Sequence, residues 1–283
     1  SERFLSFPAL YKIPLFTNVS KDAVFSAQDA KTIYEIPIFY KNQKIDDYIL
    51  KKLKVSHKKS TIKPWVTFTN KLNKCKRKVK IGMIGKYVDL EDSYKSLNES
   101  LLHASVHNNN SLEIKFIDSE DITKNKLKIL RGLQGIVVPG GFGNRGVEGK
   151  IAAANYARVN NVPYLGVCLG LQIATIEFCR NVLGLENANS TEFDENTPNP
   201  AVVFMPEISK THMGGTMRLG TKPTPFLVDD CKMRRLYGGS DHVDERHRHR
   251  YEVNPDLIER IEAEGLVYVG KDETGQRCEI MEL

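Results

Sequence analysis

From residue 79 onward, short apolar runs that end in glycine alternate with longer stretches of helical periodicity. Such runs are typical of strands that are buried on both faces of a parallel sheet. Strands are expected at 79–85 and 112–118, in the run 135–141 before its glycine turn, and in the run 163–170 that leads into a helix. Helices are expected at 93–106, 147–159 and 171–184. This alternation predicts an α/β layered domain with a mainly parallel central sheet. In such sheets the catalytic groups gather at the carboxyl ends of the strands.

The first 78 residues follow a different pattern. Residues 1–55 contain only short apolar runs between polar turns, with one helical pattern at 45–53, and so few apolar residues cannot close a core. Residues 56–78 are basic and weakly periodic, which predicts a linker with one helix through Trp65 and Phe68. The predicted domains are 1–55, the linker at 56–78, and the α/β domain at 79–283.

Charge is distributed unevenly along the chain. The net charge is +6, yet residues 1–80 contain 18 Lys and Arg against 6 Asp and Glu, a balance of +12, so residues 81–283 sum to −6. A basic run of this kind can attract nucleic acid or phosphate. No nucleic-acid motif accompanies it, and a solvated linker is the favoured interpretation. We therefore expect no nucleic-acid partner.

Composition and cysteine usage point to an ordinary globular protein of a reducing compartment. No stretch approaches the roughly 20 apolar residues of a membrane helix, and the N-terminus has no signal-peptide pattern. The five cysteines are odd in number and form no Cys-x-x-Cys pair, so neither a disulfide framework nor a zinc site is indicated. We predict a cytoplasmic protein with no membrane partner.

The sequence Gly166-Val167-Cys168-Leu169-Gly170 has the form of a nucleophile elbow, a strand followed by a sharp turn and a helix. The flanking glycines are needed because a Cβ there would collide within so tight a turn. The turn exposes the thiol and leaves it at a helix N-terminus, which is expected to favour the thiolate. The alternative is a small cysteine buried between strand and helix. Cys179, inside the predicted helix, fits that alternative well.

A second glycine-rich turn follows the preceding predicted strand, at 138–143. Such a turn can direct backbone N–H groups toward the neighbouring nucleophile. One N–H from this turn and the N–H of Leu169 would form an oxyanion hole for acyl transfer. The alternative is a turn with no catalytic role. The glycine-rich turn ends one predicted strand and the elbow ends the next, and this correspondence favours the catalytic interpretation.

These motifs resemble a known family. The segments 139–150 and 163–172 resemble class I glutamine amidotransferase domains, and the segments 186–193, 213–220 and 245–254 resemble those of CTP synthases. The segment 16–39 is similar to the end of a CTP synthase synthetase domain. The resemblance covers nearly the whole chain except the basic linker. It implies an amidotransferase-like domain preceded by a short tail of a synthetase domain.

The resemblance also implies a reaction and its ligands. The glutaminase domain releases ammonia from L-glutamine, and the protein's own synthetase domain uses that ammonia, with ATP and Mg²⁺, to convert UTP to CTP. GTP activates the glutaminase step, and the family forms tetramers. No cofactor is expected in the glutaminase domain itself, and no metal.

The family's site residues match this sequence as follows. Cys168 matches the nucleophile, and Gly141 and Leu169 match the oxyanion donors. Glutamine is contacted by these two residues and by Gly170, Leu171, Gln172, Glu192 and Arg250, with Glu192 at the α-ammonium and Arg250 at the α-carboxylate. An Arg fork suits a carboxylate because it binds both oxygens at once. Phe142 and Arg145 match positions that touch GTP, and residues 213–220 resemble a mobile lid.

Some of these residues have other interpretations. Without the resemblance, Glu192 reads as a surface acid before a turn. Arg246, Arg248 and Arg250 alternate as in a strand, which would place His247 and His249 together on the opposite face. A His-x-His pair can bind metal, although no further ligand cluster lies nearby in the sequence.

No His-Pro-Glu sequence occurs, although the family takes its general base from such a segment. The triad His and Glu are therefore unassigned, and the chain is expected to be a fragment with weak activity alone. Two alternatives remain open: the glutaminase domain of another amidotransferase, and a catalytically incomplete domain kept for regulation or assembly.

Overall fold

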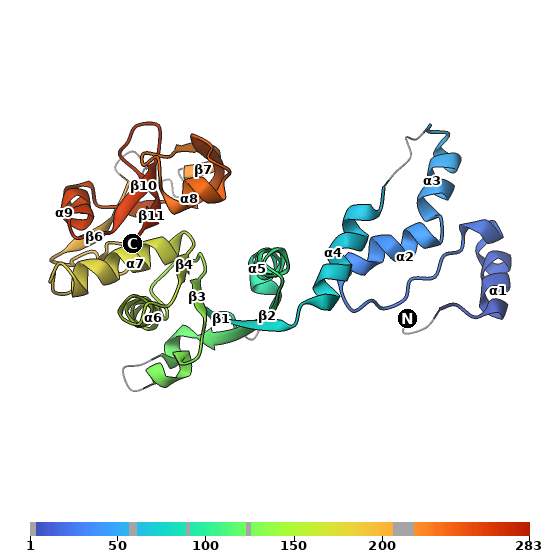
Figure 1. Ribbon diagram of the computed structural model, residues 1–283, viewed down its shortest axis with the longest axis horizontal. Helices are drawn as coiled ribbons and strands as arrows, with labels where there is room; N and C mark the ends of the chain where they lie inside the picture. The colour runs from blue at the N-terminus through green and yellow to red at the C-terminus, as the bar shows by residue number, and fades with distance from the viewer. Residues whose placement is uncertain (1–3, 57–60, 89–90, 123–125, 206–217) are drawn as a thin grey trace. The chain divides into compact units, whose positions relative to one another are not determined.

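A computed structural model describes residues 4–56, 61–88, 91–122, 126–205 and 218–283 (Figure 1). The chain divides into two compact units, which are described separately. The first comprises Ser1–Lys78 with Leu101–Ser111, and the second comprises Val79–Ser100 with Leu112–Leu283. The limits predicted for the linker, 56–78, stay a prediction.

The first unit is helical. Its helices are α1 (Phe7–Thr17), α2 (Ile36–Asn42), α3 (Ile45–Leu53) and α4 (Lys63–Lys74), with short 3₁₀ turns at Lys21–Ala23 and Ile33–Glu35. The predicted helices at 45–53 and through Trp65 and Phe68 are confirmed as α3 and α4. Within 4–56 and 61–78 only Ser26, Tyr34 and Thr69 are buried. This confirms that these residues do not close a core.

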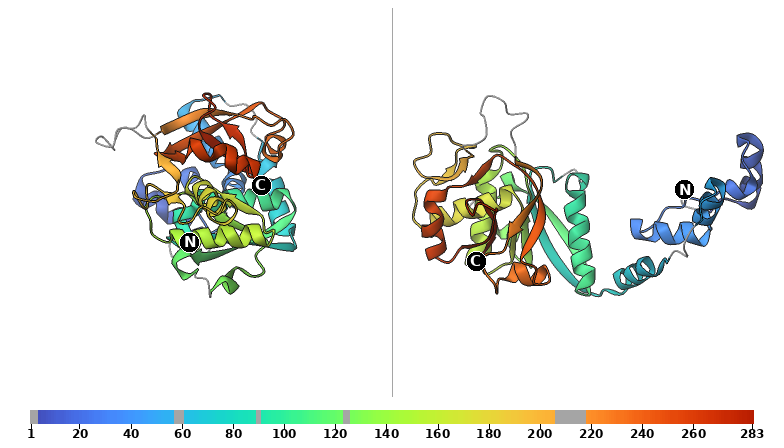
Figure 2. Two further views of the ribbon diagram at one scale, coloured as in Figure 1. Left: turned by 90° about the vertical axis from the view of Figure 1, so that its left-hand side faces the viewer. Right: turned by 90° about the horizontal axis from the view of Figure 1, so that it is seen from above.

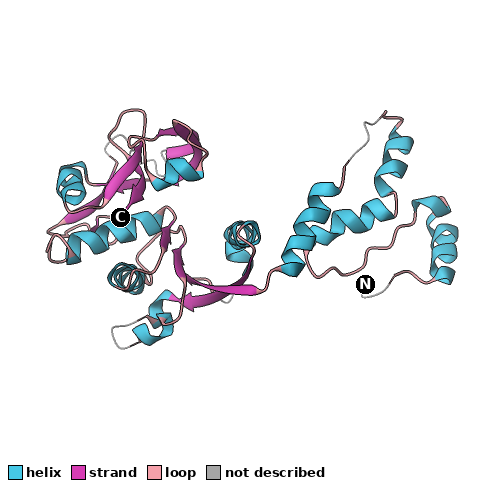
Figure 3. Cartoon of the chain, in the orientation of Figure 1, coloured by secondary structure: helices cyan, strands magenta, loops and turns pink. Residues whose placement is uncertain are grey.

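The second unit is built on a central sheet, as the glycine-terminated apolar runs predict. Strands β1 (Arg77–Gly85), β2 (Asn110–Asp118), β3 (Gly135–Val138) and β4 (Tyr164–Gly166) lie in the order β2-β1-β3-β4. These strands are labelled in Figure 1 and drawn in magenta in Figure 3. The pairs β1–β3 and β3–β4 are parallel. The pairing of Val138 with Gly166 brings the carboxyl ends of β3 and β4 together.

Three α-helices accompany these strands, namely α5 (Lys95–His107), α6 (Val147–Val159) and α7 (Leu169–Asn181). Helix α6 has the predicted limits, whereas α7 begins two residues earlier than expected, and a 3₁₀ turn at Glu91–Tyr94 precedes α5. One face of α6 packs with Ile84, Ile136 and Val138 of the sheet. Helix α7 lies between β3–β4 and the C-terminal strands (Figures 1 and 2).

The remaining strands form three small sheets. The first contains β5 (Asn189–Ser190), β6 (Pro200–Phe204) and β9 (Tyr251–Val253), the second β7 (Arg218–Pro225) and β8 (His242–His249), and the third β10 (Val267–Lys271) and β11 (Cys278–Glu282). Short helices α8 (Lys232–Leu236) and α9 (Ile258–Ala263), with a 3₁₀ turn at Pro255–Leu257, connect them. Two further 3₁₀ turns, at Ser119–Asp121 and Leu127–Leu130, follow β2. The strand predicted through the alternating arginines is β8, and Arg250 lies between β8 and β9.

Among the described residues, none of the helices combines the length and the apolar character that crossing a bilayer requires.

Candidate active site

Cys168 occupies a strained turn between β4 and α7. It is the N-cap residue of α7, with φ 54° and ψ −104°, a conformation that few non-glycine residues adopt. A Cβ on Gly166 would lie 2.4 Å from the carbonyl carbon of Gly170, and one on Gly170 would lie 2.2 Å from the Val138 oxygen. The predicted need for both glycines is therefore confirmed. The turn exposes the thiol-bearing residue at the carboxyl end of the sheet.

The glycine-rich turn after β3 lies directly beside this elbow. A Cβ on Gly140 would be 3.4 Å from the Cys168 Cβ, and one on Gly141 would be 3.5 Å from Cδ2 of Leu169. The backbone N–H of Val167 donates to the Val138 carbonyl at 3.0 Å, which ties the two turns together. Gly141 and Leu169, the predicted oxyanion donors, are thus neighbours. Burial of Leu169 fixes the start of α7 within the core.

Glu192 reaches the same turn from the segment after β5. Its Oε1 accepts a hydrogen bond of 2.7 Å from the backbone N–H of Gly143. On the other side, Lys86 Nζ, at the end of β1, donates to the Phe142 carbonyl at 2.5 Å and to the Gly143 carbonyl at 3.3 Å. Glu192 is thus not simply a surface acid before a turn, and Lys86 is a member of the site that the sequence did not suggest.

Phe142 and Arg145, the residues matched to a GTP site, flank the turn. Phe142 is 45% exposed. Arg145 donates from Nε to Glu120 at 2.9 Å and from Nη2 to the Lys86 carbonyl at 2.8 Å. Its guanidinium also lies 5.8 Å from the centroid of the Tyr87 ring. Arg145 therefore connects the turn to the end of β1.

The C-terminal part of β8 and the β8–β9 junction approach Cys168 and the elbow helix. The Arg248 carbonyl lies 4.0 Å from the Cys168 sulfur, within range of a weak S–H hydrogen bond. The Arg250 carbonyl accepts from the N–H of Met205 at 3.0 Å, and Gln172 donates from Nε2 to the Tyr251 carbonyl at 2.9 Å. These bonds bring the segment carrying Arg250 to the elbow helix. Leu171, on the same helix, packs against the main core.

The thiol of Cys168 is less acidic than the elbow predicts. Although Cys168 is exposed as a residue, protein atoms close to its sulfur displace solvent and raise its pKa. A hydrogen bond from the Leu169 backbone lowers that pKa, and the carboxylates of Glu192 and Glu252 raise it further. The contribution of the helix start has the predicted sign but is outweighed. The expectation of a stabilised thiolate is therefore wrong for this structure, because desolvation and two like charges oppose the helix N-terminus.

Comparison with known proteins identifies the family. A model described as "Glutamine amidotransferase class-I" matches residues 89–283, and one described as "CTP synthase N-terminus" matches residues 1–55. The chain belongs to the class I glutamine amidotransferase family. The resemblance to CTP synthases is also confirmed over its length.

Individual relatives of this amidotransferase chain agree. It is 46% identical over 287 residues to a CTP synthase of Thermococcus kodakarensis, covering 100% of this chain and 53% of that protein. It is 44% identical over 299 residues to CTP synthase 2 of Saccharomyces cerevisiae, covering 96% of this chain and 52% of that protein. The chain thus spans about half the length of these curated relatives.

A solved structure is similar as well. It is described as "Trypanosoma brucei CTPS - glutaminase domain with bound acivicin", and it superposes with a TM-score of 0.65 at 40% identity. The match covers 71% of this chain and 77% of that one. The amidotransferase fold predicted from the sequence is confirmed.

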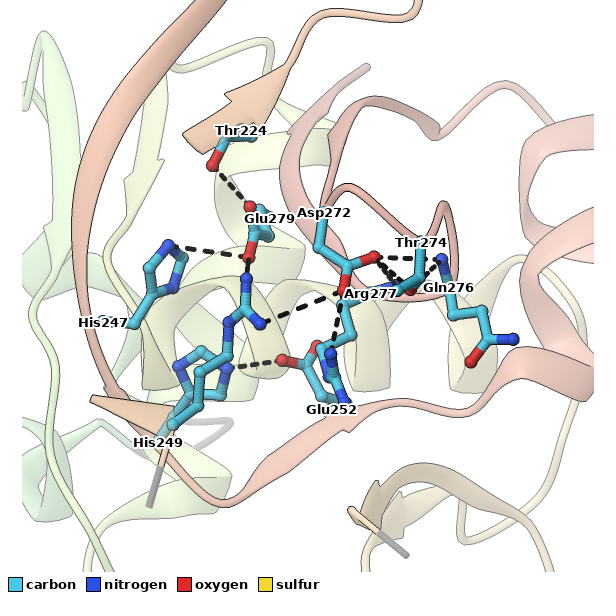
Figure 4. Close-up of polar contacts among 10 residues, drawn as sticks. Thr224, His247, His249, Glu252, Asp272, Thr274, Gln276, Arg277 and Glu279 are labelled. Atoms are coloured by element: carbon cyan, nitrogen blue, oxygen red, sulfur yellow. Dashed lines mark hydrogen bonds and ion pairs between the residues drawn. The ribbon is translucent and has the colours of Figure 1, made fainter. Parts of the chain in front are cut away.

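A buried network of charged side chains supports the β8–β9 junction of the amidotransferase (Figure 4). Glu279 of β11 accepts from Arg218 Nη2 at 2.6 Å, bonds the hydroxyl of Thr224, and lies 3.5 Å from His247 Nε2. His249 contacts Glu252 through Nε2. The contacts of Glu279 join β7 and β8 to the β10–β11 hairpin, and the contact between His249 and Glu252 joins β8 to β9.

The far end of the same network is a turn that closes this hairpin. Asp272 accepts from Arg277 Nη1 at 2.8 Å, from the Thr274 hydroxyl at 2.7 Å and from the Gln276 backbone at 3.1 Å. Burial would raise its pKa, but the pKa is lowered, because hydrogen bonds from the Thr274 hydroxyl and from the backbone N–H groups of Arg277 and Gln276, together with the charge of Arg218, outweigh desolvation. The charges are therefore paired within the fold.

The two histidines do lie together, with ring centroids 5.4 Å apart, as the alternation predicts. Their nitrogens face Glu279 and Glu252 respectively. Across the described part of the chain, no group of three His, Cys, Asp or Glu side chains could hold a metal ion. The predicted lid, 213–220, falls largely outside the described residues, apart from Arg218–Gly220 in β7. Cys179 is fully buried, which confirms its place in the core.

Proposed function

We propose that this chain is the glutaminase part of a CTP synthase. The Cys168 sulfur attacks the side-chain amide carbon of L-glutamine, and the C–N bond breaks. The nitrogen takes up the proton lost by the thiol and leaves as ammonia. Water then cleaves the thioester, which yields glutamate and restores the thiol. The proton passes through a general base, which the family supplies from a His-Pro-Glu segment that this sequence does not contain.

The residues around Cys168 bind different groups of the substrate. Gly141 and Leu169 stabilise the oxyanion that forms on the amide oxygen. Glu192 binds the α-ammonium and Arg250 the α-carboxylate, so that a zwitterionic substrate meets one opposite charge at each end. Gly170, Leu171 and Gln172 line the elbow side, and Gln172 fixes the segment that carries Arg250 through its bond to Tyr251.

One observation carries this proposal: a strained Cys168 at the start of α7, with the backbone of Gly140 against its side chain. A turn that costs conformational energy persists where the surrounding structure enforces it, and such turns cluster at reactive sites. The similar trypanosomal domain is described with acivicin bound, which supports a site of the same chemistry in this chain.

The same relatives support a proposal for the reaction of the complete protein. We propose that the ammonia aminates UTP in an ATP- and Mg²⁺-dependent synthetase domain of the same protein. GTP would act beside Phe142 and Arg145, where Lys86 and Arg145 place two positive charges next to the turn. A homo-tetramer in the cytoplasm is the expected assembly, and the five free thiols suit a reducing compartment.

The test is glutamate release by the complete protein, with and without GTP, beside a Cys168→Ala variant. We expect release that GTP stimulates and that the variant abolishes. Release that survives in Cys168→Ala would overturn the assignment of the nucleophile. Release that GTP leaves unchanged would favour an amidotransferase that serves another synthetase.

A further inference from the structure

One peptide unit of the oxyanion turn is bonded at both ends by charged side chains. The carbonyl of Phe142 and the N–H of Gly143 belong to the same planar peptide and point in opposite directions. The carbonyl accepts from Lys86 Nζ at 2.5 Å, and the N–H donates to Glu192 Oε1 at 2.7 Å. Rotation of this peptide would break both bonds at once. Hydrogen bonds to charged groups are about twice as strong as neutral ones.

The backbone at this point has few other restraints. Gly143 has φ +74°, and a Cβ there would meet no atom within 4 Å. Packing therefore does not fix its conformation, and a glycine moves readily between positive and negative φ. The orientation of the turn consequently depends on the two charged residues. The predicted oxyanion donor Gly141 lies two residues before Gly143 on the same turn.

The two charged residues are close to each other as well as to the peptide. Burial lowers the pKa of Lys86, the charge of Glu192 opposes that change, and Arg145 adds to it. Lys86 is itself fixed, because its carbonyl accepts from Arg145 Nη2 at 2.8 Å and its N–H meets the Tyr94 hydroxyl at 3.1 Å. The backbone of Lys86, directly after β1, is thus anchored through both its N–H and its carbonyl.

From this geometry we propose that Lys86 is a positioning residue for glutamine hydrolysis, holding the Phe142–Gly143 peptide against Glu192 so that the oxyanion turn keeps its catalytic orientation. The inference rests on the proposed glutaminase function. Within the described residues, Glu192 Oε2 accepts no hydrogen bond, so one carboxylate joins the turn through Oε1 and can receive the substrate ammonium through Oε2. Substrate binding and the orientation of the turn are then linked through Glu192.

The test compares Lys86→Met, Lys86→Arg and Lys80→Met in the complete protein. Lys80 is the matched control, because it lies on β1, the strand that Lys86 directly follows, and forms an ordinary surface pair with Glu113 at 2.9 Å. We expect Lys86→Met to lower kcat for glutamine hydrolysis on the order of 10- to 100-fold with a smaller change in KM, since misplaced catalytic groups cost about that much. Lys86→Arg should recover most of the loss, and Lys80→Met should match the parent.

Two further measurements distinguish a positioning role of Lys86 from a general disruption of the fold in Lys86→Met. Labelling of Cys168 by acivicin should slow in Lys86→Met, whereas alkylation by iodoacetamide, which needs no oxyanion hole, should not. Amide hydrogen exchange in residues 139–146 should become faster in the same variant. Equal kinetics and exchange in Lys86→Met and Lys80→Met would overturn the proposal, as would equal loss of both labelling reactions. A parent protein without glutaminase activity would instead overturn the proposed function, and the exchange measurement would still test the contact.

Discussion

Gln172 donates a hydrogen bond of 2.9 Å from its side-chain Nε2 to the backbone carbonyl of Tyr251, 79 residues away. The side chain of Gln172 is almost fully buried, so the bond is shielded from water. It joins α7, the helix that Cys168 caps, to the segment that contains Arg250. The site is therefore assembled by contacts between the elbow helix and the β8–β9 junction.

Replacing Gln172 with methionine should weaken glutamine binding. Methionine has similar size but cannot donate, so the Tyr251 carbonyl loses its partner and the Arg250 segment loosens. We expect KM for glutamine to rise roughly 3- to 30-fold, equivalent to about 0.7–2 kcal/mol. Steady-state glutaminase assays measure this. Gln134→Met is the control, since Gln134 bonds the Lys80 backbone at an exposed position. An unchanged KM in Gln172→Met would contradict the prediction.

Alanine at Gly170 should destabilise the fold, although alanine is the better helix former by about 1 kcal/mol. The new Cβ would lie 2.2 Å from the Val138 oxygen, and neither backbone can yield easily. We expect the free energy of unfolding to fall by about 1–3 kcal/mol. Urea unfolding measures it. Gly140→Ala is the control, because its Cβ would meet nothing nearer than 3.4 Å. Similar midpoints for both variants would show that the turn relaxes freely.

Neutralising Glu192 should make Cys168 more reactive in the absence of substrate. The Glu192 carboxylate raises the pKa of Cys168, so Glu192→Gln should lower that pKa, while the glutamine oxygen can still accept from Gly143. At pH 7.5 we expect iodoacetamide to react roughly two- to fivefold faster. The pH dependence of alkylation, measured in a Cys75→Ser background, reports the shift. Glu264→Gln, at an exposed position after α9, should leave the rate unchanged, and a slower rate in Glu192→Gln would refute the assignment.

Acid should destabilise the buried network around His247. Burial lowers the pKa of this histidine, with Glu279 and Glu245 opposing and His249 and Arg218 adding to the effect. Below pH 6.5 the unfolded chain binds a proton that folded His247 does not. The stability contributed by neutral His247 is therefore present above pH 6.5 and lost as the pH falls toward the lowered value. The loss is at most about 1.4 kcal/mol per pH unit.

A His247→Asn variant should show a smaller decrease in unfolding free energy between pH 7.5 and pH 5.5 than the parent. His107→Asn serves as the control, because His107 is exposed at the end of α5. Identical pH slopes in the parent and in His247→Asn would exclude this histidine as a source of acid sensitivity. The lowered pKa of Asp272 adds a loss in the same direction, but only as the pH falls below 3.8.

Much of this architecture could be predicted from the sequence because the strands and the elbow are each specified by a few consecutive residues. The runs at 79–85 and 135–141 are apolar and end in glycine, which predicts a buried strand in each without any knowledge of its neighbours. The observed strands are Arg77–Gly85 and Gly135–Val138, so the second run is a strand only over its first four residues. The elbow around Cys168 depends on five consecutive residues. Glycine was required there by steric contact, and the structure gives the contacting atoms.

The supporting contacts could not be predicted because they join distant residues. Lys86 follows a predicted strand and reads as an ordinary surface lysine until the turn at 142–143 is placed beside it. Glu279 meets Arg218 across 61 residues of sequence. The acidity of Cys168 depends on Glu192 and Glu252, whose distances from the sulfur are set only by the complete fold. Sequence patterns alone do not give the spatial distances between residues that are far apart in the chain.

Gly166 and Gly170 affect how a relative that has lost its activity can be recognised from its sequence. Backbone atoms alone exclude side chains at Gly166 and Gly170, whatever residue stands between them. A lineage could therefore replace Cys168 by a single substitution, give up hydrolysis, and still retain both glycines to keep the domain folded. Persistence of the glycine pair reports an inherited architecture, whereas the identity of the residue at position 168 reports the chemistry.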